Sequence, residues 1–587
     1  MQKCILIFLI SSGFVLAAQS NAAAQNIPAN IIPQLGTVQQ QDLDSAKRLE
    51  QERRNIRDYQ NYKKNSEQKS KETAKKEKKP ATQKAKISEY KTKGVYVEKF
   101  EVEPSEILSE NEIKSIIEDY EKTNVTIAAL NEMLDRINGL YLDKGYVTAR
   151  AYLPEQTIEN RIIKIGLLEG KVGDVEIEGN RWTKDSHIKD RLNLSSGEIF
   201  NIQKLEENML VYNRYNDNIE IKGNLTAGKK SGTTDVKIEA KEKAPYHLIA
   251  VADNAGRKTI GKNRTGLIAS HDSLLGYRDK LSAGVYANRY SWTPFIDYNI
   301  PVNRYDGRIG VSFSHNEAEI GHGDFKDFKI ESRSQNYSLY YTQPIIRELH
   351  RELNSTTSFT YKRAITSFDG YDLYEDKIPE LKTGLNFRYD TERGIWYLAQ
   401  SVSYAAPWFQ NRIDYWKFEG SVLRLHDFGY RILGQFRGNY QYIPQDIIPT
   451  ADQMLAGGFG TVRGYSQGLL TAKSGYQLGA EIYFPIAPET FYIDCKPYRT
   501  DEYFRPFVFT DYAALYPYKG SGNGAEGFNN SDILLSAGAG LRIQLPYKIV
   551  AKVAYGVPLR HNKYETHHGG DWSFELSLAP DFNKFFE

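Results

Sequence analysis

The sequence is poor in sulfur and in net charge. Its 587 residues include only 2 Cys and 4 Met, and 76 Lys and Arg nearly balance 74 Asp and Glu, which leaves a net charge of +2. Cys4 lies in a segment that we expect to be removed, so the mature chain keeps Cys495 alone and forms no internal disulfide. A net charge this small also provides no global field that would attract nucleic acid.

Long apolar runs are scarce as well. Lys3, the apolar residues 4–18 and the small residues 22–24 are typical of a signal peptide over residues 1–24, and the alternative is an N-terminal membrane anchor. The run is short for an anchor, and after Gln25 no run approaches the roughly 20 residues of a membrane helix. An exported chain of this kind is either soluble or a membrane β-barrel, because lipid admits only helices and closed barrels.

The motifs of common enzymes are missing too. The stretch GGFGTVRGYSQG at residues 457–468 begins as G-x-G, but Arg463 stands where a dinucleotide-binding loop needs its third glycine. Residues 223–230, GNLTAGKK, end in Lys where a phosphate loop needs Ser or Thr, so we interpret them as a hairpin turn. His567 and His568 have no second ligand pair, and no G-x-S-x-G is present. We therefore expect no enzyme, no catalytic residue, no cofactor and no metal site.

Two segments of unusual composition follow the signal peptide. Residues 25–62 contain the stretch 39–62, which is rich in helix formers and lacks Gly and Pro, yet its apolar stripe is thin. Such a helix cannot fill a core and suits a solvated position or a wet channel. Residues 63–93 are rich in Lys, which is typical of a mobile linker or of a merely solvated tail.

Residues 94–171 and 172–245 repeat one order of elements. In the first, a strand around Tyr96 is followed by a helix with a capping box at 109–112, a second helix over 126–144 and two further strands. The second segment repeats this order, so we predict two small α+β modules of like topology. A three-stranded sheet leaves an edge open to an added peptide strand, unless charge blunts that edge.

Residues 246–587 lose the helical periodicity and consist of short alternating segments divided by polar turns. Only ten of the 41 tyrosines precede Tyr246. Membrane barrels have strands of about 9–11 residues and aromatic girdles, and roughly 20 residues per strand and loop allow about 16 strands here. We predict a membrane all-β barrel of about 16 antiparallel strands, with a large secreted β-sandwich or propeller as the alternative.

Arg463 has two interpretations from the residues alone. An arginine inside a barrel is costly unless a carboxylate meets it. In FVFTDYAAL, Phe507, Phe509 and Asp511 share one face, because the side chains of a strand alternate. Asp511 is therefore a candidate lumen-facing carboxylate that would bind the guanidinium through two parallel hydrogen bonds. The alternative is a surface loop with a solvated arginine.

Several stretches together resemble two-partner secretion transporters, the family of hemolysin secretion and activation proteins. VRGY after GGFGT is similar to the inward-folded loop motif of the family, and FTDYA at residues 509–513 resembles its F-x-D-x-G strand motif, with Ala513 in place of the glycine. Residues 253–266 resemble its first barrel hairpin, and residues 553–559 its penultimate strand. The two modules look like paired POTRA domains, and the stretch 39–62 is similar to the plug helix of the family.

The resemblance implies two periplasmic POTRA domains, at residues 94–171 and 172–245, before an outer-membrane barrel over residues 246–587. It implies that the loop arginine pairs with the strand aspartate, which here are Arg463 and Asp511, with Phe509 in the same strand motif. The loop motif itself consists of Val462, Arg463, Gly464 and Tyr465.

The resemblance also implies a partner, a large secreted exoprotein that is an adhesin, a hemolysin or a contact-dependent toxin. We expect this exoprotein to add a strand to a POTRA edge, with Thr148, Arg150 and Tyr152 as candidate contacts, and to pass through the barrel without nucleotide. We further expect contact with outer-membrane lipid, no nucleic-acid partner, and a monomer. The alternatives are a barrel-assembly insertase of the same superfamily, which usually carries more POTRA modules, and a passive porin.

Overall fold

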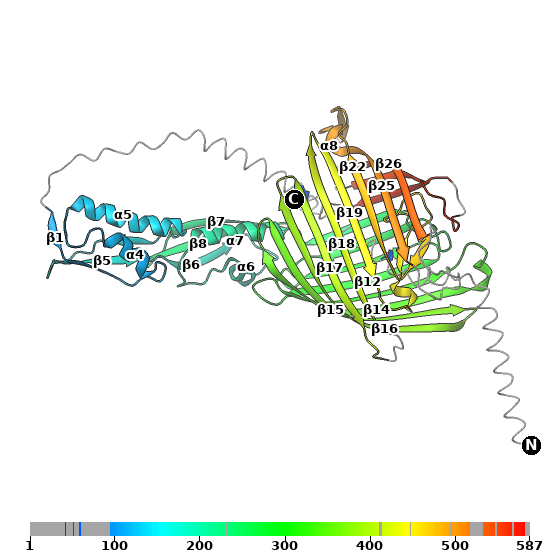
Figure 1. Cartoon of the computed structure of the whole chain (residues 1–587), viewed down its shortest axis with the longest axis horizontal. Coiled ribbons are helices and arrows are strands. Elements are labelled where there is room, and N and C mark those ends of the chain that lie inside the picture. Colours follow the sequence, from blue (N-terminus) through cyan, green and yellow to red (C-terminus); the bar gives the residue numbers. More distant parts are fainter. Residues whose placement is uncertain are drawn as a thin grey trace, which may run out of the picture. The chain divides into compact units, whose positions relative to one another are not determined.

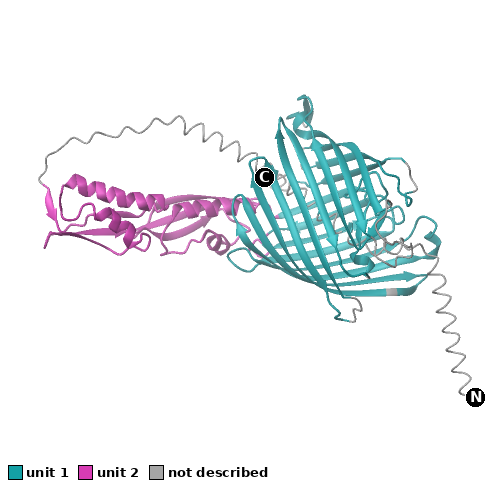
Figure 2. Ribbon diagram, viewed as in Figure 1, with its two compact units in different colours: residues 1–68, 246–272, 279–587 teal, residues 69–245, 273–278 magenta. Residues whose placement is uncertain are grey.

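The structure, a computed structural model, divides the chain into two compact units. Unit 1 comprises residues 1–68, 246–272 and 279–587, and unit 2 comprises residues 69–245 and 273–278 (Figure 1, Figure 2). The described residues are 41–42, 48, 51, 58–59 and 94–587, apart from 231, 410–413, 447, 494–495, 517–531, 546–548, 566–568 and 581–587.

Several predictions from the sequence lie outside the described residues. They are the signal peptide 1–24, the Lys-rich linker 63–93 and the pair His567 and His568. Among the helices that are described, none is long and apolar enough to cross a membrane.

The first module of unit 2 is a three-stranded sheet with two helices. Its elements are β1 Val95–Val97, β2 Lys99–Val102, α4 Glu110–Ile117, β3 Thr123–Val125, α5 Ile127–Asp143, β4 Arg150–Tyr152 and β5 Ile162–Leu168. The sheet order is β2–β5–β4, and β1 and β3 form a small extra sheet that the alternation pattern did not predict. Met133, Ile137 and Tyr141 on one face of α5 are fully buried, so this face closes the core of the module.

The second module repeats this arrangement. Its elements are β6 Lys171–Glu178, α6 Asp185–Leu192, α7 Ile202–Tyr215, β7 Ile219–Ala227 and β8 Thr233–Glu242. The sheet order is β6–β8–β7, and β7 and β8 pair antiparallel. GNLTAGKK therefore runs from β7 into the turn before β8, as the hairpin interpretation predicts. The shared order of strand, helix, helix, strand and strand confirms the internal repeat.

Unit 1 contains a closed barrel of sixteen antiparallel strands (Figure 1). They are β9 Tyr246–Asp253, β10 Arg264–His271, β11 Lys280–Ala287, β12 Ser291–Pro301, β13 Arg308–Glu319, β14 Ile330–Arg347, β15 Arg351–Phe368, β16 Tyr371–Thr391, β17 Gly394–Ala405, β18 Tyr415–Gly429, β19 Ile432–Tyr442, β22 Ser474–Tyr483, β25 Phe504–Tyr516, β26 Ile533–Leu545, β27 Ile549–Pro558 and β28 Asp571–Leu578. The last strand pairs with the first, and this register closes the barrel. Closure leaves no open sheet edge, which lipid would not tolerate.

The last strand shows how the sequence sorts its side chains between the two faces of the barrel. Trp572, Phe574, Leu576 and Leu578 of β28 are exposed on the outer face. Ser573, Glu575 and Ser577 alternate with them and are buried on the lumen side. An apolar outer face and a polar inner face are what a lipid-embedded barrel with a wet lumen requires. The period of two visible in the sequence is therefore the direct cause of the two faces.

The connections differ between the two ends of the barrel. An even number of strands places the start of β9 and the end of β28 at one end, which we call the near end. The longest described far-end connection, residues 443–473, contains η2 Thr450–Asp452, β20 Met454–Ala456 and β21 Leu470–Ala472. Another far-end connection contains η1 Lys326–Phe328, and near-end residues 484–503 contain β23 Thr490–Ile493, β24 Lys496–Arg499 and α8 Thr500–Tyr503. The other near-end turns are short, as in outer-membrane barrels.

The N-terminus of α4 offers a local test of the first module. The Ser109 hydroxyl accepts a hydrogen bond from the N–H of Glu112, whose carboxylate accepts one from the N–H of Ser109. The hydrogen bonds from Lys144 and Ser109 lower the pKa of Glu112 to about 2. Ser109→Ala removes the cap, and a lost N-cap costs about 1 kcal/mol. We expect roughly fivefold faster amide exchange in the first turn of α4, measured by hydrogen–deuterium exchange on the whole protein.

Ser115→Ala is the matched control for this test. Ser115 lies in the same helix and is exposed, and its hydroxyl donates only to the main-chain oxygen of Glu112. We expect exchange in the first turn of α4 to stay at the wild-type rate in this variant. An equal acceleration in both variants would show that the capping box does not hold the helix terminus.

Candidate functional site

The far-end loop 443–473 folds back as a hairpin, with β20 and β21 as its two paired strands. The tip of this hairpin, residues 457–468, carries glycines with φ angles from +63° to +110°. L-residues with a side chain rarely adopt such angles, so the glycines let the tip turn tightly. Gly464 has a second role, because a Cβ on it would lie 2.7 Å from the carbonyl carbon of Gly556 on β27. The tip can therefore lie directly against the main chain of the barrel wall.

Arg463 at the tip ends in a pocket of buried carboxylates. Its Nε and Nη2 donate to Oδ2 and Oδ1 of Asp511 on β25, at 2.7 and 2.9 Å. Its Nη1 lies 2.6 Å from Oε1 of Glu481 on β22. Arg463 is 4% exposed and Asp511 is fully buried, so water hardly screens these ion pairs. The structure thus brings Arg463 and Asp511 together through the two parallel hydrogen bonds that the sequence suggested.

The other residues of the loop and strand motifs surround this pair. The ring of Phe509 lies under the guanidinium of Arg463, with 3.5 Å from Cζ to the ring centroid. The Tyr465 hydroxyl is within hydrogen-bond distance of the main-chain oxygens of Leu535 and Arg560, at 3.0 and 2.7 Å.

Apolar contacts pack the loop onto the barrel wall beside this pair. Val462 is fully buried in an apolar cluster that includes Ala513 and Leu515. Ala513, which replaces the glycine of the strand motif, is itself fully buried there. Its methyl group therefore contributes to the packing of the loop.

Three charged residues of this pocket were not predicted from the sequence. Lys552 on β27 donates to both carboxylate oxygens of Glu481, at 3.1 and 2.9 Å, and Arg437 on β19 donates to Asp511 at 2.9 Å. With Arg463, three cations meet two carboxylates, and we call these five residues the tip pocket. Arg437, Glu481 and Lys552 each stand at a lumen-facing position of a strand, which alternation could have shown. Alternation alone does not say which of the many lumen-facing charges meet.

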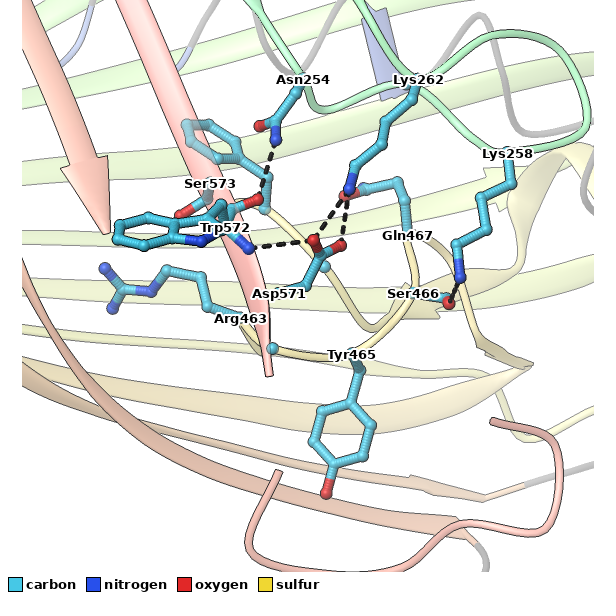
Figure 3. Close-up of a pocket in the computed structure, with 14 residues that line it drawn as sticks. Asn254, Lys258, Lys262, Arg463, Tyr465, Ser466, Gln467, Asp571, Trp572 and Ser573 are labelled. Atoms are coloured by element: carbon cyan, nitrogen blue, oxygen red, sulfur yellow. Dashed lines mark hydrogen bonds and ion pairs between the residues drawn. The ribbon is translucent and has the colours of Figure 1, made fainter. Parts of the chain in front are cut away.

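A second far-end loop, residues 254–263, contacts the tip through Lys258 (Figure 3). Lys258 donates to the Ser466 hydroxyl at 2.9 Å, and Lys262 donates to both carboxylate oxygens of Asp571 at 2.8 Å. Within the described part of the chain, no group of three or more His, Cys, Asp or Glu side chains is arranged to hold a metal ion. Both lysines of this loop are thus hydrogen-bonded, Lys258 to the tip and Lys262 to the first residue of β28.

Part of the predicted helix 39–62 is described, and its residues lie inside the barrel. Residues 41, 42, 48, 51, 58 and 59 are helical, and the remainder of the stretch lies outside the described residues. Asp42 is 2.7 Å from Arg264 at the far end, and the Tyr59 hydroxyl donates to Asp427 at 2.8 Å at the near end. Arg264 begins β10 and Asp427 lies near the end of β18, so the two contacts stand at opposite ends of the barrel. The described residues are thus placed along the length of the lumen.

The candidate substrate contacts Thr148, Arg150 and Tyr152 lie at an edge of the first module. Arg150 and Tyr152 are exposed on the edge strand β4, and Thr148 precedes this strand. The outward N–H of Ala151 already donates to the side chain of Asn138 on α5, at 2.7 Å. This edge is therefore short and partly capped.

The second module has a longer edge at β7. Asn213 on α7 donates to the main-chain oxygen of Ile221 at 2.9 Å and accepts from its N–H at 2.7 Å, so it caps the start of this strand. Residues 222–227, which follow, are all exposed. Edge strands of this kind can pair with an added peptide. The order of elements along the chain does not show which strand of the repeat lies outermost, so this edge could not be predicted from the sequence.

Comparison with known proteins identifies the family. Residues 232–543, more than half of the 587, match the family of haemolysin secretion/activation proteins ShlB/FhaC/HecB. The protein belongs to this family. Residues 95–170 match the ShlB-type POTRA domain, and residues 170–243 match the POTRA family described as surface antigen variable number repeat.

Several curated relatives are similar over most of the chain. The heme/hemopexin transporter protein HuxB of Haemophilus influenzae is 23% identical over 77% of this chain and 81% of its own length. The hemolysin transporter protein ShlB of Serratia marcescens is 23% identical over 60% of this chain and 65% of its own length. The outer membrane transporter CdiB of Escherichia coli is 21% identical over 61% of this chain and 63% of its own length.

Solved structures share the fold. CdiB from Escherichia coli aligns with a TM-score of 0.62 at 16% identity, over 86% of this chain and 93% of its own. CdiB from Acinetobacter baumannii aligns with a TM-score of 0.59 at 14% identity, over 89% and 98% of the two chains. BamA from Haemophilus ducreyi without POTRA domains 1–3 aligns at 0.53 with 13% identity, over 83% and 100%. These likenesses confirm the predicted fold of POTRA domains before a 16-stranded barrel.

Membership of the family fixes the function and the orientation. The protein is a two-partner secretion transporter of the outer membrane, and it secretes an exoprotein through its barrel. Its two modules are periplasmic POTRA domains. The near end of the barrel, where the chain passes from the second POTRA domain into β9, is therefore the periplasmic end. The far end, with the loop 443–473, is extracellular.

The ion pair at the tip leads to a direct test of the loop. Arg463→Ala leaves two carboxylates with one cation fewer and frees the tip, so we expect secretion to stop. The barrel closes through main-chain hydrogen bonds, so assembly and surface exposure should stay normal. Secretion is measured as exoprotein in the culture medium, and assembly by heat-modifiable migration on gels.

Arg333→Ala is the matched control, because Arg333 is exposed on the outer side of β14 and its closest carboxylate is that of Glu331, at 3.2 Å. We expect normal secretion in this variant. Normal secretion in Arg463→Ala as well would remove the loop tip from the mechanism.

Proposed function

We propose that the transporter binds its unfolded exoprotein at a POTRA sheet edge, releases the N-terminal helix from the lumen, and passes the exoprotein as an extended hairpin beside the loop that carries Arg463. The observation that carries this proposal is the way the described helix residues and the loop are held. The described helix residues contact the barrel through ion pairs and hydrogen bonds, and the loop tip is held by buried ion pairs beside an apolar cluster. Ion pairs and hydrogen bonds can exchange for contacts with water when a segment leaves.

The exoprotein in this proposal is a large secreted adhesin, hemolysin or contact-dependent toxin. The relatives support such a class, since they include a hemolysin transporter and a heme/hemopexin transporter. The sequence offers no phosphate-binding loop, so the direction of transport comes from folding of the exoprotein outside the cell. The transporter acts as a monomer in contact with outer-membrane lipid.

The edge of β7 in the second POTRA domain is the better candidate for strand addition. β7 has nine residues, whereas β4 has three. Residues 222–227 of β7, beyond the asparagine cap, are all exposed. Ile221 points its main-chain groups outward to Asn213, so Gly223 and Leu225 also point theirs outward, because the direction alternates along a strand. Thr148, Arg150 and Tyr152 remain a second proposed contact at the shorter edge.

Leu225→Pro tests the β7 edge, because proline removes the outward N–H that an added strand would use. We expect binding of the secretion domain of the exoprotein to weaken roughly three- to tenfold, as for one lost hydrogen bond. The measurement is biolayer interferometry on the whole transporter in detergent. Leu225→Ala keeps the N–H and should bind as the wild type does. Equal weakening by alanine and by proline would assign the contact to the leucine side chain and exclude strand addition here.

The N-terminal helix acts as the plug in this proposal. Asp42 and Arg48 are ion-paired with Arg264 and Glu575 on the barrel wall, at 2.7 and 2.9 Å. Asp58 accepts a hydrogen bond from the Tyr397 hydroxyl at 2.8 Å. A helix with so thin an apolar stripe leaves little apolar surface exposed when it moves into the periplasm. The linker 63–93 gives it the length of chain to do so.

Deletion of residues 39–62 should raise the single-channel conductance in planar bilayers, because it empties part of the lumen. A deletion of equal length in the linker, residues 64–87, is the control and should leave the conductance unchanged. The two variants lose the same number of residues, so a difference between them reports on the plug. Equal conductance in all three proteins would show that the helix does not obstruct the pore.

A further inference from the structure

A second cluster of buried charges holds the loop 443–473 at its base. Asp452, at the end of η2 and just before β20, is 2.8 Å from Lys362 on β15 and 3.4 Å from Lys417 on β18. Both lysines also face Glu380 on β16, at 2.7 and 3.4 Å. The side chains of these four residues are between 4% and 14% exposed. We call them the base anchor, and none of them belongs to the motifs found in the sequence.

Further contacts fix the same part of the loop. The Tyr415 hydroxyl donates to Asp452, and Gln441 donates to the main-chain oxygen of Asp452 at 2.8 Å. Ile448 packs in an apolar cluster with Ile378 and Tyr415. The base anchor therefore lies on β15, β16 and β18, whereas the tip pocket lies on β19, β22, β25 and β27. The loop is held at two separate parts of the barrel wall.

The two sites differ in the net charge that the barrel wall keeps when the loop residue leaves. In the tip pocket, Arg437 stays paired with Asp511 and Lys552 with Glu481, so the wall without Arg463 is neutral. In the base anchor, Lys417 also lies 3.8 Å from Glu419, which pairs with Lys382, so the wall without Asp452 keeps three lysines against two carboxylates. An unpaired charge in a site with little water is strongly unfavourable. Departure of the tip is therefore electrostatically tolerated by the wall, and departure of the base is not.

We propose that Asp452 is a positioning residue that keeps the base of the loop docked on the barrel wall throughout secretion, while Arg463 leaves its pocket and returns as the exoprotein passes. The paired strands β20 and β21 then swing about the base anchor. This inference rests on the proposed passage of the exoprotein beside the loop. The base anchor is then the fixed point of the loop, and the tip pocket binds the part of the loop that moves.

Docking of the base is tested on the purified whole transporter, without exoprotein. Ile448→Cys in a Cys495→Ser background places a thiol at a position that is 7% exposed. Adding Asp452→Ala should accelerate alkylation of this thiol by a water-soluble maleimide by roughly 100-fold, as expected for loss of one partner of a buried ion pair. Adding Arg363→Met with Glu375→Gln, a pair 2.6 Å apart on β15 and β16 that touches none of the anchor residues, should leave the rate unchanged. An unchanged rate with Asp452→Ala would overturn the anchor.

A charge-balanced variant covers the case in which Asp452→Ala fails to assemble. Asp452→Ala with Lys362→Met leaves Lys417 facing Glu380, a neutral pair. If Asp452 only balances charge, this variant secretes normally, and the proposal fails. If Asp452 positions the loop, the thiol stays reactive and secretion stays at least about tenfold below the wild type.

A covalent tether between the loop base and the wall shows whether the base stays docked during secretion or must open. Asp452→Cys with Lys417→Cys, in the Cys495→Ser background, removes one charge of each sign and secretes poorly before treatment. Bridging the two thiols with a short bismaleimide should restore secretion, because the base is docked again. Loss of the remaining secretion on bridging would show that the base must open and would overturn the proposal. The alkylation assay involves no transport, so its result stands apart from whether the exoprotein passes beside the loop.

Discussion

In the hydrocarbon core of a membrane, each main-chain N–H and C=O group must find its partner within the protein, and this constraint determines the whole second half of the chain. Pairing of β28 with β9 satisfies it, because the sheet then has no edge. A barrel of sixteen strands is wide enough for a wet lumen, so side chains from its own wall cannot fill it. This width leaves room for the folded-back loop and for the described helix residues.

A wet lumen also decides which forces hold the segments inside it. Beside the apolar clusters around Val462 and Ile448, the loop is held by ion pairs that are shielded from water by their neighbours. Arg463 is paired with two carboxylates that each have a further cation, and Asp452 is paired with two lysines that share one further carboxylate. Networks of this kind are specific in geometry and reversible, which suits a channel that holds its contents between transport events.

The POTRA domains are stabilised differently, because each folds around a small apolar core in water. The helix faces with Ile113, Ile116 and Ile117, and the alternation in β5, could be read directly from the sequence. The extra β1–β3 sheet could not, because strands of three residues carry almost no periodic signal. The asparagine caps at Ala151 and Ile221 also depend on how each helix lies on its sheet.

The sequence by itself determined the barrel, its strand count, the two α+β repeats and the face on which each lumen side chain stands. These features depend on periodicity and on local capping, which are properties of neighbouring residues. Asp511 could be assigned to the lumen face in this way, and the family resemblance paired it with Arg463. Only the tertiary structure decided that Glu481, Arg437 and Lys552 complete that pocket, and that Asp452 meets lysines from two other strands. Residues far apart in the chain meet according to strand register, barrel closure and the path of the loop, and no local pattern encodes these.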